Sequence, residues 1–558
     1  MSFDPLNPLI VQADRSVFLE AFNPRAEAAR TDIAPFAELI SSPEHLHTYR
    51  VTPLSLWNAA SAGLTANGIM EALARHAKFP LPDNVATDVR ELVGRWGRLK
   101  LERYDSALLL IVAAGDEALL TELGRHKEIR PLLGEVMSST VVTVPAAHRG
   151  VLKQQLIEVG WPVDDQAGYT DGAAFAVRLS SSLQVRDYQR EAAEAFYRAG
   201  SEQGGSGVVV LAPGAGKTVV GMAAMSLVGQ RTLVLTTNRT SVNQWHRELL
   251  NKTDLSPEDV SEYAAGKALT PVTLCTYQML THRKRSSLSG EDGAYPHLAL
   301  IGASEWGLII YDEVHLLPAP VFRLTAEVQA RRRLGLTATL IREDGREGDV
   351  FALIGPKRYD QPWKTLEAQG WIAQAHCLEV RLRLPPEERV QYAVAPDQDK
   401  HRIAAENPVK RTVLRQVMAR HSGLPTLIIG QFLDQLELIG ADLEVPVITG
   451  KTPQRTRETL FQAFREGHLK TLVLSRVGNF ALDLPDAELL IQVSGAFGSR
   501  QEEAQRLGRL LRPKADGRAA YFYSLVTRET SEEDFAHHRQ LFLAAQGYSY
   551  GILDQDEV

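Results

Sequence analysis

The chain of 558 residues contains only two cysteines, Cys275 and Cys377, and both lie among apolar neighbours. Two thiols cannot build a disulfide framework or a cysteine-based metal cage, so a disulfide-stapled domain and a zinc module are excluded. The chain also lacks a basic excess, because 61 Lys and Arg stand against 68 Asp and Glu and the formal net charge is −7. A nucleic-acid surface must therefore be local and cannot arise from bulk charge.

No apolar run is long enough to span a bilayer, and no secretory signal peptide opens the chain. We therefore expect a soluble protein of the cytoplasm. The apolar share of 44% and the charged share of 23% are typical of globular proteins. A length of 558 residues predicts three or four domains.

A glycine loop lies between an apolar run at 208–211 and a stretch of helical character at 219–227. This order of strand, loop and helix is the context that a phosphate-binding loop requires. Loop N–H groups converge on phosphate oxygens, Lys217 supplies a charge to the β- and γ-oxygens, and the Thr218 hydroxyl reaches Mg²⁺. The strict pattern would place glycine at 211, where this chain has leucine. The residues expected to bind ATP here are Pro213, Gly214, Ala215, Gly216, Lys217 and Thr218.

Two carboxylates follow a second apolar run, 308–311, which reads as a buried parallel strand. Asp312 is expected to hold Mg²⁺, normally through water, and Glu313 to orient and deprotonate the attacking water. An Asp-Glu pair after a strand is weak evidence when isolated, but it is strong evidence beside Lys217 and Thr218. Together the two segments predict a nucleoside triphosphate hydrolase, with Lys217, Asp312 and Glu313 as catalytic residues.

Apolar strands alternate with helical stretches in two successive parts of the chain, from about 204 to 355 and again from about 425. This alternation predicts an α/β fold with two tandem parallel-sheet domains, of which only the first carries a phosphate loop. The expected strands lie at 208–211, 233–235, 272–274, 308–311 and 334–336 in the first domain and at 427–429, 447–448, 472–474 and 490–491 in the second.

The region before the phosphate loop is expected to be a mainly helical domain followed by a small α+β module. Thr52 and Pro53 form an N-cap and a first helical residue, and Thr65 begins a second amphipathic helix. Such a helix pair is either a unit that binds nucleic acid or a partner, or simply a packed helical hairpin. Residues 140–144 then predict a strand and residues 151–159 a helix.

Residues 505–512 read Gln-Arg-Leu-Gly-Arg-Leu-Leu-Arg in what looks like a helix. Gln505, Arg509 and Arg512 share one face because they are spaced i, i+4 and i+7. An exposed basic face is one interpretation. We favour a catalytic interpretation, in which a domain without its own phosphate loop places arginines against the γ-phosphate held by the other domain.

Two further clusters are less specific alone. Thr337, Ala338 and Thr339 follow an expected strand and are candidates for coupling the γ-phosphate to the cleft between the domains. Arg186 and Gln189 lie about 28 residues before Lys217 and are candidates for reading adenine, with Gln189 making the contacts to the base edge.

With these segments identified, the chain resembles a superfamily 2 helicase, and within that superfamily the XPB family (xeroderma pigmentosum group B). The resemblance covers nearly the whole chain. The segments that carry it are Gly214–Lys217, the DEVH sequence Asp312–His315, Leu334–Leu340, the R-E-D triplet Arg342, Glu343 and Asp344, Ser475–Gly478 with Asp483–Pro485, Ser499–Gln501 leading into Gln505–Arg512, and the N-terminal Phe18–Phe22, His47–Tyr49 and Gly63–Leu64.

The resemblance implies a domain organisation. Residues 1–128 would form an XPB-like N-terminal helical domain and residues 129–180 a damage-recognition-like module. Residues 181–365 and 366–558 would be two RecA-like helicase domains, the first binding ATP and the second carrying a thumb-like segment at about 384–408.

The resemblance also implies functional residues beyond the phosphate loop. Gly478 and Asp483 would join the ATP site. DNA would be tracked mainly through its phosphates, and Arg342 would insert at the strand junction. The positions matching DNA-contact motifs are Thr237, Arg239, Thr276, Tyr277, Arg342, Glu343, Asp344, Thr449 and Gly450.

These observations predict an ATP-dependent DNA helicase or translocase of 3′→5′ polarity, with ATP and Mg²⁺ as cofactors, acting in DNA repair or transcription. We expect it to be nucleoid-associated when on DNA, and a repair nuclease or a transcription protein would be its partner. One alternative is a double-stranded DNA translocase that remodels protein–DNA complexes without strand separation. Another is a partner-docking subunit in which ATP acts as a conformational switch.

Overall fold

The computed structural model describes residues 3–41, 45–105, 107–167, 172–201, 204–263, 269–280, 304–316, 332–338, 347–361, 363–475, 487–495, 519–534, 536 and 550–558. The chain forms two compact units. The first comprises Met1–Leu211 and Gly216–Asp360, and the second comprises Ala212–Ala215 and Gln361–Val558. Among the described residues, no helix has the length and apolar character needed to cross a membrane.

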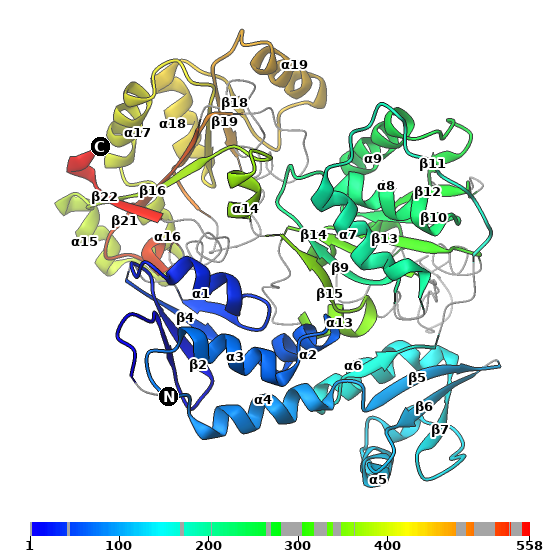
Figure 1. The fold of residues 1–558 in the computed structure, drawn as a ribbon. Coiled ribbons are helices and arrows are strands. Elements are labelled where there is room, and N and C mark those ends of the chain that lie inside the picture. The colour runs from blue at the N-terminus through cyan, green and yellow to red at the C-terminus, as the bar shows by residue number, and fades with distance from the viewer. Residues whose placement is uncertain are drawn as a thin grey trace. The chain divides into compact units, whose positions relative to one another are not determined.

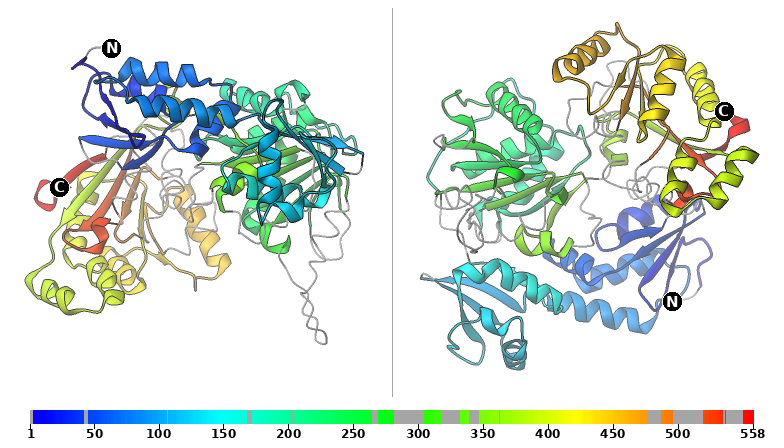
Figure 2. Two further views of the ribbon diagram at one scale, coloured as in Figure 1. Left: turned by 90° about the horizontal axis from the view of Figure 1, so that it is seen from below. Right: turned by 180° about the vertical axis from the view of Figure 1, so that it is seen from behind.

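The N-terminal region of the first unit combines helices with an antiparallel sheet that the sequence analysis did not predict. The sheet has the order β1 (Leu9–Val11), β2 (Ser16–Glu20), β4 (Leu46–Arg50), β3 (Glu38–Ser41). Its helices are α1 (Ala26–Ile33), α2 (Pro53–Ser61), α3 (Ala66–His76) and α4 (Asp83–Arg95). Figure 2 shows these blue elements gathered in one group.

The predicted starts of two of these helices are confirmed. The Thr52 hydroxyl accepts a hydrogen bond from the Ser55 N–H at 3.0 Å, and Pro53 is the first residue of α2. The Thr65 hydroxyl accepts from the Gly68 N–H at 3.1 Å at the start of α3. Each side chain satisfies an N–H group that the first helical turn cannot pair internally.

A small α+β module follows, with a four-stranded sheet of order β7 (Val141–Pro145), β6 (Ala107–Val112), β5 (Leu99–Tyr104), β8 (Val163–Asp165). Because β5 and β6 belong to this sheet, the module begins before the boundary at residues 128 and 129 that the resemblance implied. The strand and the helix predicted here are present as β7 and α6 (Arg149–Glu158), and α5 (Glu117–Arg125) completes the module. Arg149 holds Asp165 at 2.7 and 2.9 Å, and Lys153 adds a third contact at 2.8 Å. Burial would raise the pKa of Asp165, but these two cations hold that pKa well below its usual range.

The first seven-stranded sheet is wholly parallel and contains all five predicted strands. Its order is β11 (Val260–Glu262), β12 (Val272–Thr276), β10 (Thr232–Thr236), β13 (Leu308–Asp312), β14 (Arg332–Thr337), β9 (Ser206–Val210), β15 (Lys357–Asp360). The helices around it are α7 (Asp187–Tyr197), α8 (Lys217–Val228), α9 (Arg239–Lys252), α10 (Tyr277–Leu280) and α13 (Glu347–Leu353) (Figure 1). Since all strands run the same way, their carboxyl ends meet at one edge.

The second unit contains another parallel seven-stranded sheet and the four strands predicted for it. Its order is β18 (Val447–Ile448), β19 (Thr471–Ser475), β17 (Thr426–Gly430), β20 (Leu489–Gln492), β21 (Ala520–Thr527), β16 (Ala375–Leu382), β22 (Tyr550–Asp554). The helices are α14 (Trp363–Ala368), α15 (Pro386–Val394), α16 (Asp397–Ala405), α17 (Val409–Arg420), α18 (Leu433–Leu443) and α19 (Gln454–Arg465). The segment expected to be thumb-like, 384–408, forms α15 and α16. The two sheets confirm the expected tandem α/β architecture.

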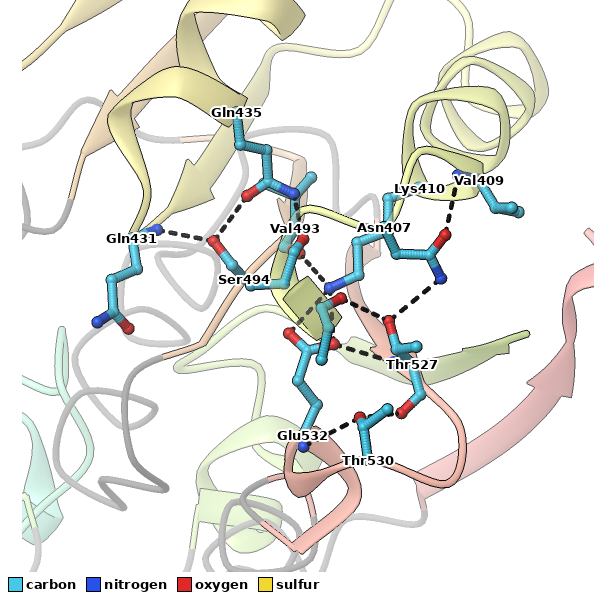
Figure 3. A network of polar contacts seen from close by, with 12 residues as sticks. Asn407, Val409, Lys410, Gln431, Gln435, Val493, Ser494, Thr527, Thr530 and Glu532 are labelled. Carbon is cyan, nitrogen blue, oxygen red and sulfur yellow. Dashed lines mark hydrogen bonds and ion pairs between the residues drawn. The ribbon is translucent and has the colours of Figure 1, made fainter. Parts of the chain in front are cut away.

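A buried ion pair stabilises the second unit (Figure 3). The Lys410 ammonium on α17 donates to both carboxylate oxygens of Glu532, at 2.9 and 2.7 Å, and to the Val493 carbonyl at 2.8 Å. The Lys410 side chain is fully buried and that of Glu532 is 4% exposed. Glu532 also accepts from the Thr527 N–H at the end of β21. One salt bridge therefore ties α17 to the carboxyl ends of β20 and β21.

We expect Lys410→Met to lower the stability of the second unit by about 3–5 kcal/mol, because it leaves the Glu532 carboxylate buried without its cation. Hydrogen exchange of the backbone amides in β17, β20 and β21 measures the stability of the second unit separately from that of the first. Lys410→Met combined with Glu532→Gln should recover most of the loss. The exposed pair Arg389–Glu529 is the matched control, and Arg389→Met should change stability by less than about 0.5 kcal/mol. Equal effects of Lys410→Met and Arg389→Met would contradict this account.

Candidate active site

The phosphate loop leaves the carboxyl end of β9 and enters α8 at Lys217. Gly214 and Gly216 have φ angles of 81° and 82°, which favour glycine over any residue with a Cβ atom. A Cβ atom on Gly216 would also lie 2.5 Å from Nε2 of Gln189. The loop is thus shaped for a close approach by backbone N–H groups, and the free N–H groups of the first turn of α8 favour an anion.

The predicted carboxylates lie beside this loop because β13 and β9 are separated in the sheet by a single strand, β14. Nζ of Lys217 lies 3.3 Å from Oε1 of Glu313. Glu313 has a φ angle of 51°, a backbone conformation that costs a non-glycine residue energy and is often found at functional sites. The three residues expected to be catalytic within the first unit, Lys217, Asp312 and Glu313, are therefore brought together.

The electrostatics of the carboxylate pair fit a divalent cation. Burial first and the neighbouring Glu313 charge second raise the pKa of Asp312, although Trp245 and Lys217 act in the opposite direction. A cation at this edge would offset both causes. Within the described residues, no three Asp, Glu, His or Cys side chains form a metal cluster. This arrangement matches Mg²⁺, which proteins hold through one or two carboxylates plus substrate phosphates.

His315 joins the carboxylates to the residues predicted to couple the γ-phosphate to the interdomain cleft. Its Nδ1 lies 2.6 Å from the Thr337 hydroxyl and 3.5 Å from Oε2 of Glu313. The Thr337 carbonyl in turn accepts from the Leu211 N–H at 3.0 Å, at the start of the phosphate loop. Thr337 and Ala338 are both buried. Thr337 therefore contacts both catalytic segments, while its coupling role remains a prediction.

The residues predicted to read adenine lie at the start of α7. The Arg186 N–H donates to the Gln189 side-chain oxygen at 3.0 Å, and the Arg186 guanidinium donates to the Tyr188 hydroxyl at 3.0 Å. Gln189 is buried next to Gly216. Gln189 therefore lies next to the phosphate loop, and adenine recognition by Arg186 and Gln189 stays a prediction.

The described residues predicted to contact DNA lie at the carboxyl ends of three strands, β10, β12 and β18, or within three residues after them. Thr237 accepts from Nδ2 of Asn238 at 3.1 Å, and the largely exposed Arg239 lies 3.2 Å from Glu262. In the second unit, Thr449 and Gly450 follow β18, and the Thr449 carbonyl accepts from Arg457 at 3.3 Å. Thr276 ends β12, where its hydroxyl accepts from the Met279 N–H at 3.3 Å.

The prediction for Tyr277 needs a correction. Its side chain is 2% exposed, and its hydroxyl donates to the main-chain oxygen of Asp312 at 2.8 Å. Burial and the nearby Asp312 charge raise the pKa of this phenol well above its ordinary value. The side chain is therefore a structural support of the carboxylate segment and has no surface for a DNA phosphate.

Several predicted site residues lie outside the described residues. They are Thr339, Arg342, Glu343, Asp344, Gly478, Asp483, Gln505, Arg509 and Arg512.

The sequence analysis missed one residue that touches the site. Trp245 on α9 donates its indole N–H to Oδ2 of Asp312 at 2.9 Å. The only signal for it in the sequence is an aromatic residue on the helix after the strand at 233–235, and that pattern equally indicates a core residue.

Three family models match this chain. They are the ERCC3/RAD25/XPB C-terminal helicase over residues 366–557, the helicase conserved C-terminal domain over residues 9–138, and the type III restriction enzyme, res subunit, over residues 182–342.

Curated relatives match over almost the whole chain. Proteins named DNA 3′-5′ helicase XPB from Kineococcus radiotolerans and Mycobacterium tuberculosis are each 52% identical over 553 residues, which is 99% of this chain and 97% and 98% of theirs. The general transcription and DNA repair factor IIH helicase/translocase subunit XPB of Antonospora locustae is 34% identical, covering 97% of this chain and 81% of that protein.

The two ends of α8 provide a matched pair of glycine substitutions. Gly216 precedes the helix and Gly229 follows it with a φ angle of 62°, and a Cβ atom on Gly229 would meet nothing within 4 Å. We expect Gly216→Ala and Gly229→Ala each to cost about 1–2 kcal/mol of stability through the left-handed backbone. Only Gly216→Ala should also weaken ATP binding by about tenfold or more, because its Cβ atom displaces Gln189 and distorts the loop. Equal ATP affinities in the two variants, measured by calorimetric titration, would exclude this shape requirement.

Proposed function

The chain belongs to the XPB family of DNA helicases, and we propose that it hydrolyses Mg²⁺-bound ATP at the site formed by the phosphate loop and the Asp312–Glu313 pair. It uses this reaction to unwind DNA or to translocate along it in the 3′→5′ direction. The observation that carries this proposal is the 3.3 Å approach of Lys217 to Glu313 at the edge of a parallel sheet. A phosphate-binding lysine and a candidate base meet there, beside a carboxylate suited to a metal.

Each residue has a role that follows from its position. Lys217 and the N-terminus of α8 bind and orient the triphosphate, with Thr218 and Asp312 as the groups that would hold Mg²⁺. The bound cation would supply charge neutralisation on the phosphate oxygens. Glu313 is the group proposed to accept a proton from the attacking water, and its contact with Lys217 places it beside the lysine that binds the triphosphate.

The second unit would complete the reaction through arginines. Gln505, Arg509 and Arg512 are proposed to meet the γ-phosphate from the second RecA-like domain, which has no phosphate loop of its own. Arginine fingers are worth about 10³–10⁵ in rate where they stabilise transition-state charge. Hydrolysis would then depend on domain closure, which is how the chemistry would drive movement on DNA.

DNA is proposed to contact Thr237, Arg239, Thr276, Thr449 and Gly450, whose loops follow strand ends in the two units. We further propose that the protein acts in repair or transcription in the cytoplasm, on the nucleoid when bound, alongside a nuclease or a transcription protein. Translocation without strand separation is a second candidate, and the name helicase/translocase carried by the Antonospora relative supports keeping it.

We expect Lys217→Ala and Glu313→Gln each to lower the ATP turnover number by about 10²-fold or more, while DNA affinity survives. The loss follows because one variant removes the charge on the β- and γ-oxygens and the other removes the base. Turnover should be measured with single-stranded, double-stranded and forked DNA at several salt concentrations. Wild-type turnover that DNA leaves unchanged would overturn the proposal. Turnover raised only by a protein partner would instead support an ATP-switched docking subunit.

Strand displacement and triplex displacement separate the two candidate activities. A helicase of 3′→5′ polarity should release the labelled strand of a fork bearing a 3′ single-stranded tail. A double-stranded translocase should remove the third strand from a triplex while leaving the fork intact. Glu313→Gln is the control in both assays, since it should bind the substrates without displacing either strand.

A further inference from the structure

Asp312 receives hydrogen bonds from two segments outside the phosphate loop. The Trp245 indole donates to its carboxylate oxygen Oδ2 at 2.9 Å, and the Tyr277 hydroxyl donates to its main-chain oxygen at 2.8 Å. Trp245 lies on α9, which follows β10, and Tyr277 begins α10, which follows β12. α9 starts with Arg239 and α10 directly follows Thr276, two positions proposed to contact DNA, so the residue proposed to hold Mg²⁺ is supported by two segments that adjoin those positions.

Hydrogen bonds connect Asn238, the residue before α9, to Thr236 and Thr237, and Arg239 is the first residue of the helix. The Asn238 side chain caps the helix by accepting from the Ser241 N–H at 2.9 Å, and its amide donates to the Thr237 hydroxyl at 3.1 Å. The Thr236 hydroxyl donates to the Asn238 carbonyl at 3.1 Å. A shift of Thr237 on binding DNA would therefore act on the start of α9 through these hydrogen bonds.

Trp245 is also fixed against the helix that follows the phosphate loop. Its side chain is buried, with the whole residue 1% exposed, and a Cβ atom on Gly221 of α8 would come within 2.5 Å of its Cη2 atom. The glycine thus creates the space that the indole ring occupies. The indole lies between α8, which begins with Lys217, and the carboxylate of Asp312.

A buried indole needs an acceptor for its one N–H group, and any backbone carbonyl would satisfy this requirement. Here the acceptor is the carboxylate whose orientation decides how a cation is held. Groups that orient a metal-holding carboxylate typically change metal affinity or activity by about 10–100-fold when mutated. The choice of acceptor therefore has a functional consequence that core packing alone would not have.

We propose that Trp245 is a positioning residue that links the start of α9 to the Asp312 carboxylate, so that DNA at Thr237 and Arg239 and the Mg²⁺–triphosphate at Asp312 bind cooperatively. This inference rests on the proposed function, which supplies the DNA contacts and the metal role of Asp312. The coupling is reciprocal: DNA raises the affinity for metal-bound nucleotide by the same factor by which that nucleotide raises the affinity for DNA.

Trp245→Phe tests the link, because it keeps an aromatic ring in the core and removes only the N–H donor and part of the ring volume. Trp306→Phe is the matched control, since Trp306 is equally buried in the first unit but lies before the opposite end of β13. The full chain is titrated with a fluorescent ATP analogue, with and without Mg²⁺ and with and without single-stranded DNA. These titrations measure binding and do not depend on turnover.

In the Trp245→Phe variant, we expect the factor by which Mg²⁺ raises nucleotide affinity to fall about tenfold, while the nucleotide affinity without Mg²⁺ stays unchanged. The factor by which DNA strengthens nucleotide binding should fall towards one, and DNA affinity without nucleotide should stay the same. Trp306→Phe should keep the Mg²⁺-dependent gain and the coupling factor within about twofold of the wild type, because it removes the same ring volume without touching Asp312.

Gly221→Ala provides a second, independent variant, because its Cβ atom should displace the indole, and with it the N–H group, from Asp312 without removing the tryptophan. It should reproduce the loss of the Mg²⁺-dependent gain. The proposal is overturned if Trp245→Phe retains both the gain and the coupling factor, or if Trp306→Phe loses them equally. Failure of the proposed function is seen separately, as wild-type protein whose turnover does not respond to DNA.

Discussion

The balance of charge around the Asp312–Glu313 pair is the constraint on which the first unit depends. Two neighbouring carboxylates at a strand end repel each other, and burial raises the pKa of Asp312 further. Among the described residues, the Lys217 ammonium lies 3.3 Å from Oε1 of Glu313, and its charge acts against the rise in the pKa of Asp312. A divalent cation held here would offset the repulsion between the two carboxylates and part of the charge on triphosphate oxygens, and this fits a phosphate loop and a carboxylate pair at the same sheet edge.

The second unit uses a buried charge differently. Lys410 and Glu532 neutralise one another, and their remaining hydrogen-bonding capacity goes to the Val493 carbonyl and the Thr527 N–H. Such a closed pair has no unmet charge that would favour a ligand, so it serves to hold α17 and two strand ends together. In the first unit, by contrast, the pKa of Asp312 is raised despite the hydrogen bond from Trp245 and the charge of Lys217. This contrast separates a structural ion pair from a site prepared for chemistry.

The surroundings of Asp312 and Glu313 are stiff. Glu313 adopts a positive φ angle, the His315 ring lies 2.6 Å from the Thr337 hydroxyl, and Trp245 and Tyr277 each donate a hydrogen bond to Asp312. These contacts come from three neighbouring parts of the sheet. Trp245 follows β10, Tyr277 follows β12, and Thr337 ends β14. A small displacement at any of these strand ends reaches the carboxylates, because packed side chains transmit a shift instead of absorbing it. This arrangement suits an enzyme whose hydrolysis responds to a polymer bound at neighbouring loops.

The sequence by itself determined the α/β class, the positions of nine strands, the phosphate loop and the carboxylate pair, because these depend on local patterns: apolar runs, glycines and a lysine-threonine step. It also determined the two helix starts at Thr52 and Thr65. Only the tertiary structure decided that Tyr277 faces the core, that Trp245 donates to Asp312 and that Lys410 pairs with Glu532. Those contacts join residues 35, 67 and 122 positions apart. The order in which strands assemble brings them together, and no pattern within a short window of sequence records that order.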